Sequence, residues 1–454
     1  MNVIDSIFKA YDIRGIYPTE LNKELAFALG RAFAQMRIKE TQKEHPNIVV
    51  SSDSRLSSPE LSQSLIEGLQ KSGANVYFCG VASTPTFYFV VGHYAYDGGV
   101  QITASHNPKE YNGFKLVRAD AAPVSIDSGI MELKKAIQKE DFLDAEKVGE
   151  LFTLQGVVVS QIKQALGYVN PQKIKKYKIV VDSANGVGAL MFEELSKQLN
   201  CEFVKLNFEL DGTFTVHEAD PLKEKNNVQI KEEILRQKAD LGIALDGDAD
   251  RLVFFDEKGQ TVEPAILRGI LSQIFLRDFQ GGTICYDIRP GKITQDMIIE
   301  AGGKPVVTRV GHSLIKEKAR EVGAVFAGES SGHYFVLMPF GFFEEPIIIT
   351  LKLLQELSQS NKTFSQYIAP LHRYFHSGEI NFKVLDKPAV FDHLLARYKE
   401  NLKYDFDGLS FEYEDWWFNV RPSNTENLVR LNLEARSEAL MKEKVKEVEK
   451  IILG

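Results

Sequence analysis

The chain has 454 residues, of which 44% are hydrophobic and 26% charged, an ordinary composition for a soluble globular protein. Its net charge of −8 argues against a general nucleic-acid binder, because nucleic-acid phosphates require a basic face. At roughly 150 residues per domain, the length predicts about three domains.

The sequence shows no pattern typical of a targeting signal or a membrane span, and its cysteines are widely spaced. We therefore expect a cytoplasmic protein without a membrane partner. The opening stretch MNVIDSIFKAYDIRG has a charge at Asp5 and no apolar core, so we expect no signal peptide. The longest uncharged stretch, residues 72–96, is interrupted by glycine, asparagine and proline, so we expect no membrane span. The cysteines are far apart and form no C-x-x-C pair, which fits a reduced compartment; they are Cys79, Cys201 and Cys285.

Strand patterns alternate with helical patterns along most of the chain. NIVVSSDSR, from residue 47, predicts a buried strand that ends in polar residues, and residues 58–73 predict an amphipathic helix after it. The same order restarts at residues 176–200 and again at residues 282–303. We therefore expect three related α/β units. In each unit the predicted strand ends at an aspartate: Asp53, Asp182 and Asp287.

The last part of the chain follows a different order. After about Pro370 the patterns predict strand, helix, strands and helix, which is typical of a small α+β domain. The segments 143–150 and 257–263 are candidate boundaries further upstream. We thus expect four domains, at residues 1–150, 151–257, 258–369 and 370–454.

A predicted strand delivers three acidic residues in LGIALDGDADRLVFFDEKG, at Asp246, Asp248 and Asp250. In an extended segment alternate side chains face the same side, so the three carboxylates would converge and repel one another. A bound Mg²⁺ is the natural compensation, because it prefers oxygen ligands. Two alternatives are a solvated acidic turn and an EF-hand loop closed by Glu257. The EF-hand requires glycine at the position of Arg251.

The stretch QITASHNPKEYNGFK places Ser105 beside His106 in a predicted loop and ends at Lys115. A serine beside a histidine suggests a nucleophile with its base, but we do not expect two adjacent side chains to point at each other in that way. Asn107 and Pro108 favour a turn. Ser105 is therefore a nucleophile candidate without an assigned base, or part of an ordinary polar turn.

Two further loops carry polar residues suited to a phosphosugar. VFAGESSGHYF offers a carboxylate, hydroxyls and an imidazole for sugar hydroxyls, at Glu329, Ser330, Ser331 and His333; the alternative is a hairpin turn. FNVRPSNTENLVRL offers a guanidinium that can grip a phosphate, with hydroxyls and backbone N–H groups around it. Its candidates are Arg421, Ser423, Asn424 and Thr425, and the alternative is a polar hairpin loop.

Taken together and in this order, these motifs resemble the α-D-phosphohexomutase superfamily, most closely its phosphomannomutase/phosphoglucomutase branch. The resemblance runs from FKAYDIRG at residues 8–15 to RPSNTE at residues 421–426. It implies an α/β fold of four domains around a central active-site cleft. Three of these domains are related and have mixed sheets, and the fourth is the C-terminal α+β domain.

The resemblance also implies a reaction. Ser105 would carry a phosphate, and its oxygen would join Asp246, Asp248 and Asp250 around one Mg²⁺ per chain. The enzyme would interconvert hexose 1-phosphate and hexose 6-phosphate of mannose or glucose. A hexose 1,6-bisphosphate would be the intermediate and the activator.

Further roles follow from the same resemblance. Lys115 and Arg14 would be cations and proton-transfer partners at the transferring phosphate, with Arg251 as a further cation and His106 as an orienting group. Substrate would be bound by Tyr11, His312, Glu329, Ser331, His333, Arg421, Ser423, Asn424 and Thr425.

Structural alternatives stand beside some of these roles. Arg14 and Tyr11 would otherwise form a buried polar cluster, and His312 would lie beside a helix cap. Asp53 and Arg55 indicate loop architecture more than catalysis.

The sequence departs from the family pattern at three places: Asn427 in place of proline, FGFFEEP after the sugar loop, and DGDADR in place of DGDGDR, a small change at a non-ligand position. Alternative functions are a phosphoglucosamine mutase, a metal-dependent sugar phosphatase with Asp246 as nucleophile, and a non-catalytic phosphosugar-binding protein. In every case the expected partner is a small phosphosugar, bound by a monomer or weak homodimer.

Overall fold

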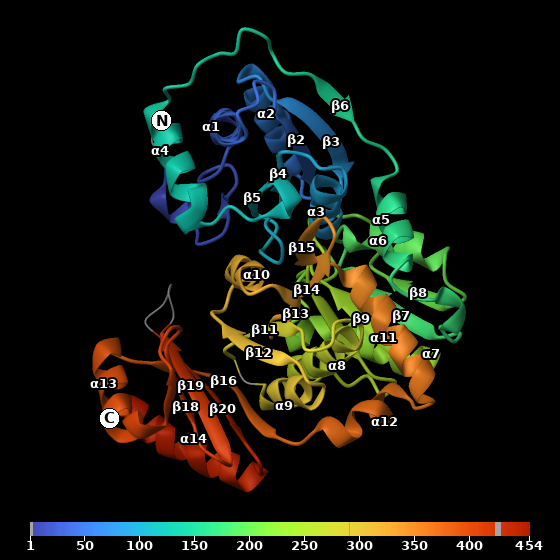
Figure 1. Ribbon diagram of the computed structural model, residues 1–454, viewed down its shortest axis with the longest axis vertical. Coiled ribbons are helices and arrows are strands. Elements are labelled where there is room, and N and C mark those ends of the chain that lie inside the picture. The colour runs from blue at the N-terminus through green and yellow to red at the C-terminus, as the bar shows by residue number, and fades with distance from the viewer. Residues whose placement is uncertain (1–2, 290, 423–427) are drawn as a thin grey trace. The chain divides into compact units, whose positions relative to one another are not determined.

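A computed structural model describes residues 3–289, 291–422 and 428–454, and Figure 1 labels its elements. The chain forms two compact units. The first, unit 1, comprises Met1–Val262 and Ser331–Ser365, and the second, unit 2, comprises Glu263–Ser330 and Gln366–Gly454. Among the described residues, the helices include none whose length and apolar character would let it cross a bilayer.

Unit 1 begins with a six-stranded mixed sheet in the order β1-β5-β4-β2-β3-β6. Its central strand β2 is buried over nearly its whole length, as expected of a strand covered on both faces. The strands are β1 (Ile13–Ile16), β2 (Asn47–Ser52), β3 (Asn75–Val81), β4 (Gly98–Ile102), β5 (Tyr111–Arg118) and β6 (Leu151–Thr153). Because β6 pairs with β3, this sheet extends past residue 150, where we expected the first domain to end.

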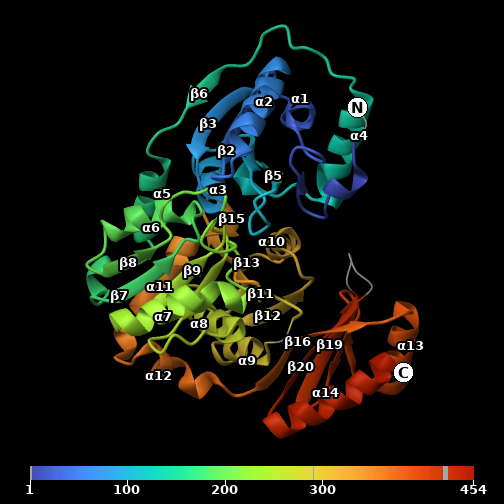
Figure 2. The same cartoon turned by 180° about the vertical axis from the view of Figure 1, so that it is seen from behind.

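Four helices belong to this sheet: α1 (Lys23–Thr41), α2 (Ser58–Lys71), α3 (Thr84–His93) and α4 (Met131–Lys139). Helices α1 and α2 lie side by side (Figure 2). They approach closely because each has a glycine at the crossing. A Cβ atom at Gly30 would lie 2.3 Å from the carbonyl oxygen of Leu65, and one at Gly68 would lie 2.1 Å from that of Phe27. A larger residue at either position would push the helices apart.

The second sheet of unit 1 has the order β10-β9-β7-β8. Strands β7, β8 and β9 are parallel, and β10 returns antiparallel to β9. A hairpin, β14 with β15, completes the strands of unit 1. The remaining elements of unit 1 are α5 (Val157–Leu166), β7 (Lys178–Asp182), α6 (Gly188–Ser196), β8 (Glu202–Leu206), α7 (Val228–Gln237), β9 (Leu241–Leu245), β10 (Leu252–Phe255), β14 (Tyr334–Met338), β15 (Gly341–Glu344) and α11 (Pro346–Ser360).

Unit 2 contains a parallel trio of strands in which β11 pairs with both β12 and β13. The strands are β11 (Thr283–Asp287), β12 (Lys304–Thr308) and β13 (Ala324–Gly328), and the helices around them are α8 (Pro264–Asp278), α9 (Lys292–Glu300) and α10 (His312–Glu321). The short helix α12 (Phe364–Ile368) follows α11 in the chain.

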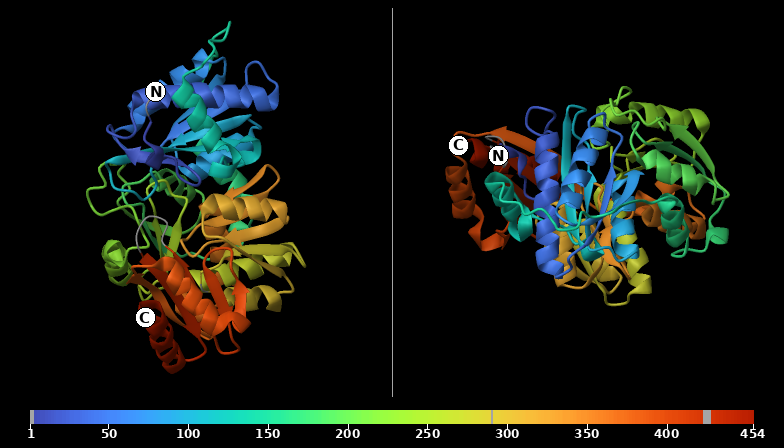
Figure 3. Two further views of the ribbon diagram at one scale, coloured as in Figure 1. Left: turned by 90° about the vertical axis from the view of Figure 1, so that its left-hand side faces the viewer. Right: turned by 90° about the horizontal axis from the view of Figure 1, so that it is seen from above.

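The C-terminal part of unit 2 is an antiparallel sheet in the order β16-β20-β19-β18-β17. Helix α14 packs on β16 and β20 and contacts α13 (Figure 3). The elements are β16 (Phe375–Lys383), α13 (Lys387–Tyr398), β17 (Leu402–Tyr404), β18 (Leu409–Glu412), β19 (Trp416–Pro422), β20 (Leu428–Ala435) and α14 (Glu438–Leu453). The predicted α+β order is therefore observed.

Candidate active site

The three aspartates of the predicted metal loop do converge, but not by the route that the sequence suggested. Strand β9 ends at Leu245, and the aspartates lie in the turn between β9 and β10. Ala249 within this turn has a left-handed φ of 60°. The expectation of an extended segment is thus wrong, because the chain has to reverse here to form the antiparallel pair. One carboxylate oxygen from each aspartate still lies within 4.8 Å of the others, and all three residues are buried: Asp246, Asp248 and Asp250.

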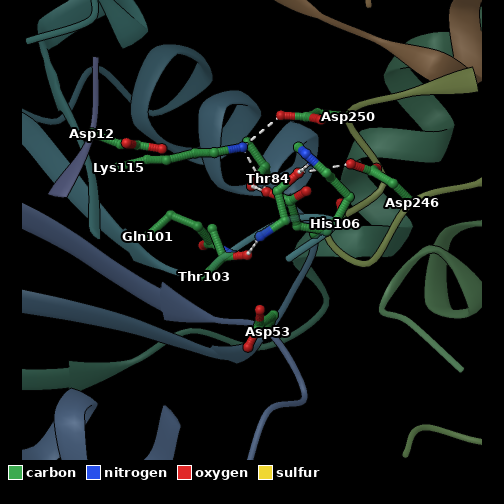
Figure 4. Close-up of polar contacts among 12 residues, drawn as sticks. Asp12, Asp53, Thr84, Gln101, Thr103, His106, Lys115, Asp246 and Asp250 are labelled. Atoms are coloured by element: carbon green, nitrogen blue, oxygen red, sulfur yellow. Dashed lines mark hydrogen bonds and ion pairs between the residues drawn. The ribbon is translucent and has the colours of Figure 1, made fainter. Parts of the chain in front are cut away.

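Lys115 brings a positive charge into this loop from strand β5 (Figure 4). Its Nζ lies 2.6 Å from Oδ2 of Asp248 and 2.5 Å from Oδ2 of Asp250. Burial by itself lowers the pKa of Lys115, but the two carboxylates outweigh burial and raise that pKa well above its usual value. The two carboxylates therefore favour the charged ammonium form of Lys115.

Ser105 lies against the same loop. Its Oγ donates a 2.8 Å hydrogen bond to Oδ2 of Asp246 and lies 3.1 Å from Nδ1 of His106. The neighbouring side chains thus do meet, contrary to our expectation, because the left-handed φ of 51° at Ser105 turns the chain sharply there. Burial, together with Arg251 and Arg14, lowers the pKa of His106 well below its usual value, so the imidazole is neutral.

Arg55 supports the loop that carries Ser105 through hydrogen bonds. This side chain is 1% exposed, and its Nε donates a 3.0 Å hydrogen bond to Oδ2 of Asp53. Its remaining donors reach backbone carbonyl oxygens at 2.7–3.0 Å, those of Ser105, Asn107, Pro108 and Tyr111. These contacts agree with the interpretation of Asp53 and Arg55 as loop architecture.

The aspartate loop has the electrostatics of a cation site. Burial, Asp250 and Asp248 raise the pKa of Asp246 well above its usual value, which means that the carboxylates repel one another. Oδ1 of Asp248 is buried and accepts no hydrogen bond from any described residue. An unpartnered carboxylate oxygen inside an acidic cluster fits a hard divalent cation such as Mg²⁺. Asp246, Asp248 and Asp250, with Oγ of Ser105 beside them, are therefore the residues that could hold one.

Arg14 of the predicted site lies close to the loop that carries Ser105. The Nη1 atom of Arg14 donates a 2.6 Å hydrogen bond to Oδ1 of Asn107, and its Nη2 pairs with Asp12. Burial lowers the pKa of Arg14, but Asp12, Tyr11 and Asp248 outweigh burial and raise it. Tyr11 is half-buried. Arg14 is therefore charged beside the Ser105 loop.

Arg251 follows the aspartates directly. Its backbone N–H donates to Oδ1 of Asp246 at 3.2 Å, and its Nε lies 3.8 Å from Oδ2 of the same residue. The Nε atom also lies 3.4 Å from Nε2 of His333. Arg251 therefore adds a second cation to the loop.

Ser331 and His333 lie at the aspartate loop as well. Nε2 of His333 is 3.1 Å from Oδ1 of Asp250, and its Nδ1 is 2.9 Å from Oγ of Ser331. Asp250, His333 and Glu344 form a second group of possible metal ligands. Because both ring nitrogens of His333 already have hydrogen-bond partners, the three aspartates are the better cation site.

The other half of the GESSGH loop belongs to unit 2. Oε1 of Glu329 accepts a 2.7 Å hydrogen bond from the backbone N–H of Gly311 and lies 3.9 Å from Nη2 of Arg289. His312, which follows Gly311, is buried and begins helix α10. Glu329 and His312 thus lie close to each other through Gly311.

Arg289 and Arg268 are residues near this loop that our sequence reasoning missed. Both pair with Asp287: Nη1 of Arg268 lies 2.7 Å from its Oδ1, and Nε of Arg289 donates to its Oδ2 at 2.7 Å. Asp287 also accepts a 3.0 Å hydrogen bond from the backbone N–H of Ser330. Arg289 follows the strand-terminal Asp287 by two residues, just as Arg55 follows Asp53. This spacing was the sequence signal that could have identified Arg289.

In the C-terminal domain, Arg421 lies in β19 opposite Arg430 of β20. Nη2 of Arg421 donates a 2.6 Å hydrogen bond to Oε2 of Glu379, and Nη1 of Arg430 lies 3.6 Å from Oε1 of the same carboxylate. Two guanidinium groups thus share one carboxylate and leave a net positive charge. The other three predicted phosphate-binding residues, Ser423, Asn424 and Thr425, lie outside the described residues.

Comparison with known families finds four matching models in chain order. They are phosphoglucomutase/phosphomannomutase alpha/beta/alpha domain I at residues 5–144, domain II at 159–259, domain III at 266–374, and the C-terminal domain of the same family at 379–451. The expected four-domain architecture is thereby confirmed.

Individual proteins give the same result. The chain is 37% identical to a phosphomannomutase of Vibrio cholerae over 455 residues, which covers 98% of each chain. It is also 37% identical to a phosphomannomutase of Methanocaldococcus jannaschii, covering 98% of this chain and 97% of the relative. Among solved structures, a phosphoglucomutase/phosphomannomutase family protein of Burkholderia thailandensis matches with a TM-score of 0.89 and 31% identity. That match covers 99% of this chain and 98% of the other.

Proposed function

Because the chain belongs to the phosphoglucomutase/phosphomannomutase family and is a hexose phosphate mutase, an isomerase, we propose that Ser105 is its phosphate carrier. The observation that carries this proposal is the position of Ser105 Oγ, 2.8 Å from Asp246 in the buried aspartate loop. A serine hydroxyl placed against a candidate cation site is suited to hold a phosphoryl group there.

The reaction has two transfers. In the first, the bond between phosphorus and Oγ of Ser105 breaks as a bond forms from phosphorus to a free hydroxyl of the hexose phosphate, and the proton of that hydroxyl passes to Oγ of Ser105. The resulting hexose 1,6-bisphosphate reorients and returns its other phosphoryl group to Oγ of Ser105, whose proton passes to the sugar oxygen that loses the phosphoryl group. The net result is a shift of phosphate between positions 1 and 6, with no net consumption of phosphate.

Positioning and charge neutralisation supply most of the catalysis in such transfers. Asp246, Asp248 and Asp250 would hold Mg²⁺, which neutralises charge on the transferring group when bound. Lys115 and Arg251 bring fixed cations to the same place.

The remaining residues of the predicted site take the following roles in our proposal. Lys115 and Arg14 serve as cations and proton-transfer partners, and neutral His106 orients the serine oxygen. Substrate is held by Tyr11, His312, Glu329, Ser331, His333, Arg421, Ser423, Asn424 and Thr425.

The substrate that we propose is a mannose or glucose phosphate, with hexose 1,6-bisphosphate as activator. A glucosamine phosphate is the nearest alternative, because the hydroxyl, carboxylate and imidazole of the GESSGH loop would also suit an amino sugar. Comparing kcat/KM for mannose, glucose and glucosamine 1-phosphates separates these substrates directly.

Intact mass spectrometry of the purified chain, combined with Ser105→Ala, tests the phosphate carrier. We expect one stable phosphate on the wild-type chain, no phosphate on the variant, and no measurable mutase turnover by the variant. Ser62→Ala is the matched control, because Ser62 is also buried in unit 1 but its hydroxyl only donates to the carbonyl of Ser58. Full turnover by Ser105→Ala would overturn the proposal. Release of inorganic phosphate by that variant would instead favour a phosphatase with Asp246 as nucleophile.

We further propose a cytoplasmic monomer or weak homodimer with four domains, whose expected bounds are residues 1–150, 151–257, 258–369 and 370–454; strand β6, just past the first of these bounds, still pairs with the first sheet. Light scattering of the purified chain measures the oligomeric state, and limited proteolysis followed by mass spectrometry locates the domain boundaries.

A further inference from the structure

Helix α3 meets the aspartate loop at its first residue, Thr84. The Oγ1 atom of Thr84 donates a 2.6 Å hydrogen bond to Oδ2 of Asp248, and its backbone N–H donates a 3.0 Å hydrogen bond to the carbonyl oxygen of Asp248. Thr84 is 0% exposed and Asp248 is 0% exposed. One residue therefore holds both the side chain and the backbone of the central aspartate.

The two oxygens of Asp248 have different surroundings as a result. Oδ2 accepts from both Thr84 Oγ1 and Lys115 Nζ, each at 2.6 Å, whereas Oδ1 accepts no hydrogen bond from the described residues. A carboxylate whose one oxygen receives two strong donors cannot rotate without losing them. Its other oxygen is then presented to a cation in a single orientation.

The start of helix α3, which carries Thr84, is itself held by buried polar contacts. Ser83 accepts a 3.1 Å hydrogen bond from the backbone N–H of Thr86 and so caps α3. Oγ1 of Thr86 donates a 2.6 Å hydrogen bond to Oε1 of Gln161, and Nε2 of Gln161 donates to the carboxylate of Glu345. These residues are all buried, so a continuous polar chain joins α3 to α5 and to the start of α11.

From these contacts we infer that Thr84 is a positioning residue of the metal site: it sets which oxygen of Asp248 faces the cation. Thr84 does not touch the reacting atoms, and it acts through Asp248. The inference rests on the proposed function, because it requires that the aspartate loop hold the divalent cation.

The test measures metal binding directly. Mn²⁺ is titrated into the metal-free full-length chain and its free concentration is followed by electron paramagnetic resonance, with the phosphorylation state of Ser105 matched between samples by intact mass. We expect Thr84→Val to raise the Kd for Mn²⁺ by about 10–100-fold, the usual range for loss of a group that orients a metal ligand. Thr84→Ser restores the hydroxyl and should restore binding.

A matched control separates positioning from folding. Thr350→Val also removes a buried hydroxyl in unit 1, but that hydroxyl donates to the carbonyl of Pro346 in helix α11; its Kd should stay at the wild-type value. If Thr84→Val folds poorly, Thr84→Ala provides the same measurement. In turnover assays, Thr84→Val should need more Mg²⁺ for half-maximal rate, and saturating Mg²⁺ should recover kcat, which a merely structural defect would not allow.

Comparing Thr84→Val with Asp248→Asn separates the role of Thr84 from the existence of the metal site. Unchanged Mn²⁺ affinity in Thr84→Val, with affinity lost in Asp248→Asn, would overturn the role of Thr84 and leave the metal site standing. Unchanged affinity in both variants would overturn the metal site and, with it, the inference.

Discussion

Asp287 ends strand β11 and the Asp246–Asp250 loop follows strand β9, yet their charges are balanced in opposite ways. Asp287 is one fully buried carboxylate with two guanidinium groups, from Arg268 and Arg289. The loop places three buried carboxylates together and pairs them with two cations, the ammonium group of Lys115 and the guanidinium group of Arg251. The first arrangement is complete within the protein, whereas the second has an excess of negative charge that a cation would balance.

The other strand-terminal aspartates resemble Asp287. Asp53 accepts hydrogen bonds from the side chain and backbone of Arg55. Asp182 accepts from Nδ2 of Asn207 at 2.9 Å and lies 3.0 Å from Nε2 of His217. An aspartate at the end of a strand is therefore an architectural anchor in this fold. The aspartate loop differs because its carboxylates outnumber the cations that pair with them.

The largest expected effect is on stability, from Asp287→Asn. The substitution leaves Arg268 and Arg289 without their carboxylate, and Arg268 is only 1% exposed. Removing one partner of a buried ion pair typically costs about 3–5 kcal/mol, so unit 2 should unfold at a much lower urea concentration. Both tryptophans of the chain, Trp416 and Trp417, lie in β19 of unit 2, so tryptophan fluorescence reports on this unit selectively.

Asp415→Asn is the matched control for that measurement. Asp415 lies in the same unit and pairs with Arg436 at 3.2 Å, but both side chains are more than half exposed. Exposed ion pairs contribute about 0–1 kcal/mol, so the urea midpoint should hardly move. A midpoint for Asp287→Asn equal to that of Asp415→Asn would show that Asp287 is not an anchor.

The residues of the aspartate loop were predictable from the sequence because they are close together in the chain and chemically distinctive. DGDADR and TASHNP each concentrate their functional groups within six residues, and the alternation of strands and helices indicated that both follow strands. The observed convergence of Ser105, Lys115 and the aspartates agrees with those local patterns.

The supporting contacts could not be predicted in this way. Thr84 and Asp248 are 164 residues apart, and Gln161 and Glu345 are 184 apart. No local period encodes such pairs, because they depend on how separate elements pack. The contact of Ser105 with His106 was missed for a different reason: it depends on one left-handed φ angle, which a serine seldom adopts.

A buried carboxylate with neutral partners extends the comparison. Glu345 accepts hydrogen bonds from Gln161 and from the backbone N–H of Ile348, and burial raises its pKa from 4.5 to about 8. Between these values the folded chain keeps the proton that the unfolded chain loses, so the stability of the wild-type chain falls as pH rises through this window. Glu345→Gln removes the titrating group. The variant should therefore gain stability relative to wild type between pH 5 and pH 8, by about 2–4 kcal/mol at ~1.4 kcal/mol per pKa unit.

Calorimetric melting temperatures of both proteins across this pH range provide the measurement, and Glu257→Gln provides the contrast. Although burial raises the pKa of Glu257, its hydrogen bonds with Ser365 and Thr363 outweigh burial and lower it. Its ionised form therefore stabilises the fold, and that contribution is lost as pH falls below about 4.5. Glu257→Gln should show no relative gain at pH 8. If the difference in melting temperature between Glu345→Gln and wild type stayed constant across this pH range, Glu345 would be ionised in the folded chain.

The smallest expected effect is that of Asp246→Asn on stability. It has the opposite sign to the effect of Asp287→Asn, although both variants replace an aspartate with asparagine. Asp246→Asn removes one charge from a cluster in which burial, Asp250 and Asp248 raise the pKa of Asp246, and asparagine Oδ1 can still accept from Ser105. The bond from the Arg251 backbone N–H to the other oxygen is lost, so the expected net gain is small. In the presence of a chelator the variant should melt about 2–4 °C higher than wild type, which corresponds to about 1 kcal/mol. Added Mg²⁺ should reverse the order, because only the chain that binds the cation tightly is stabilised by it. If Asp246→Asn lowered the melting temperature with and without Mg²⁺, the aspartate loop would be an anchor like Asp287, and its excess charge would have no function.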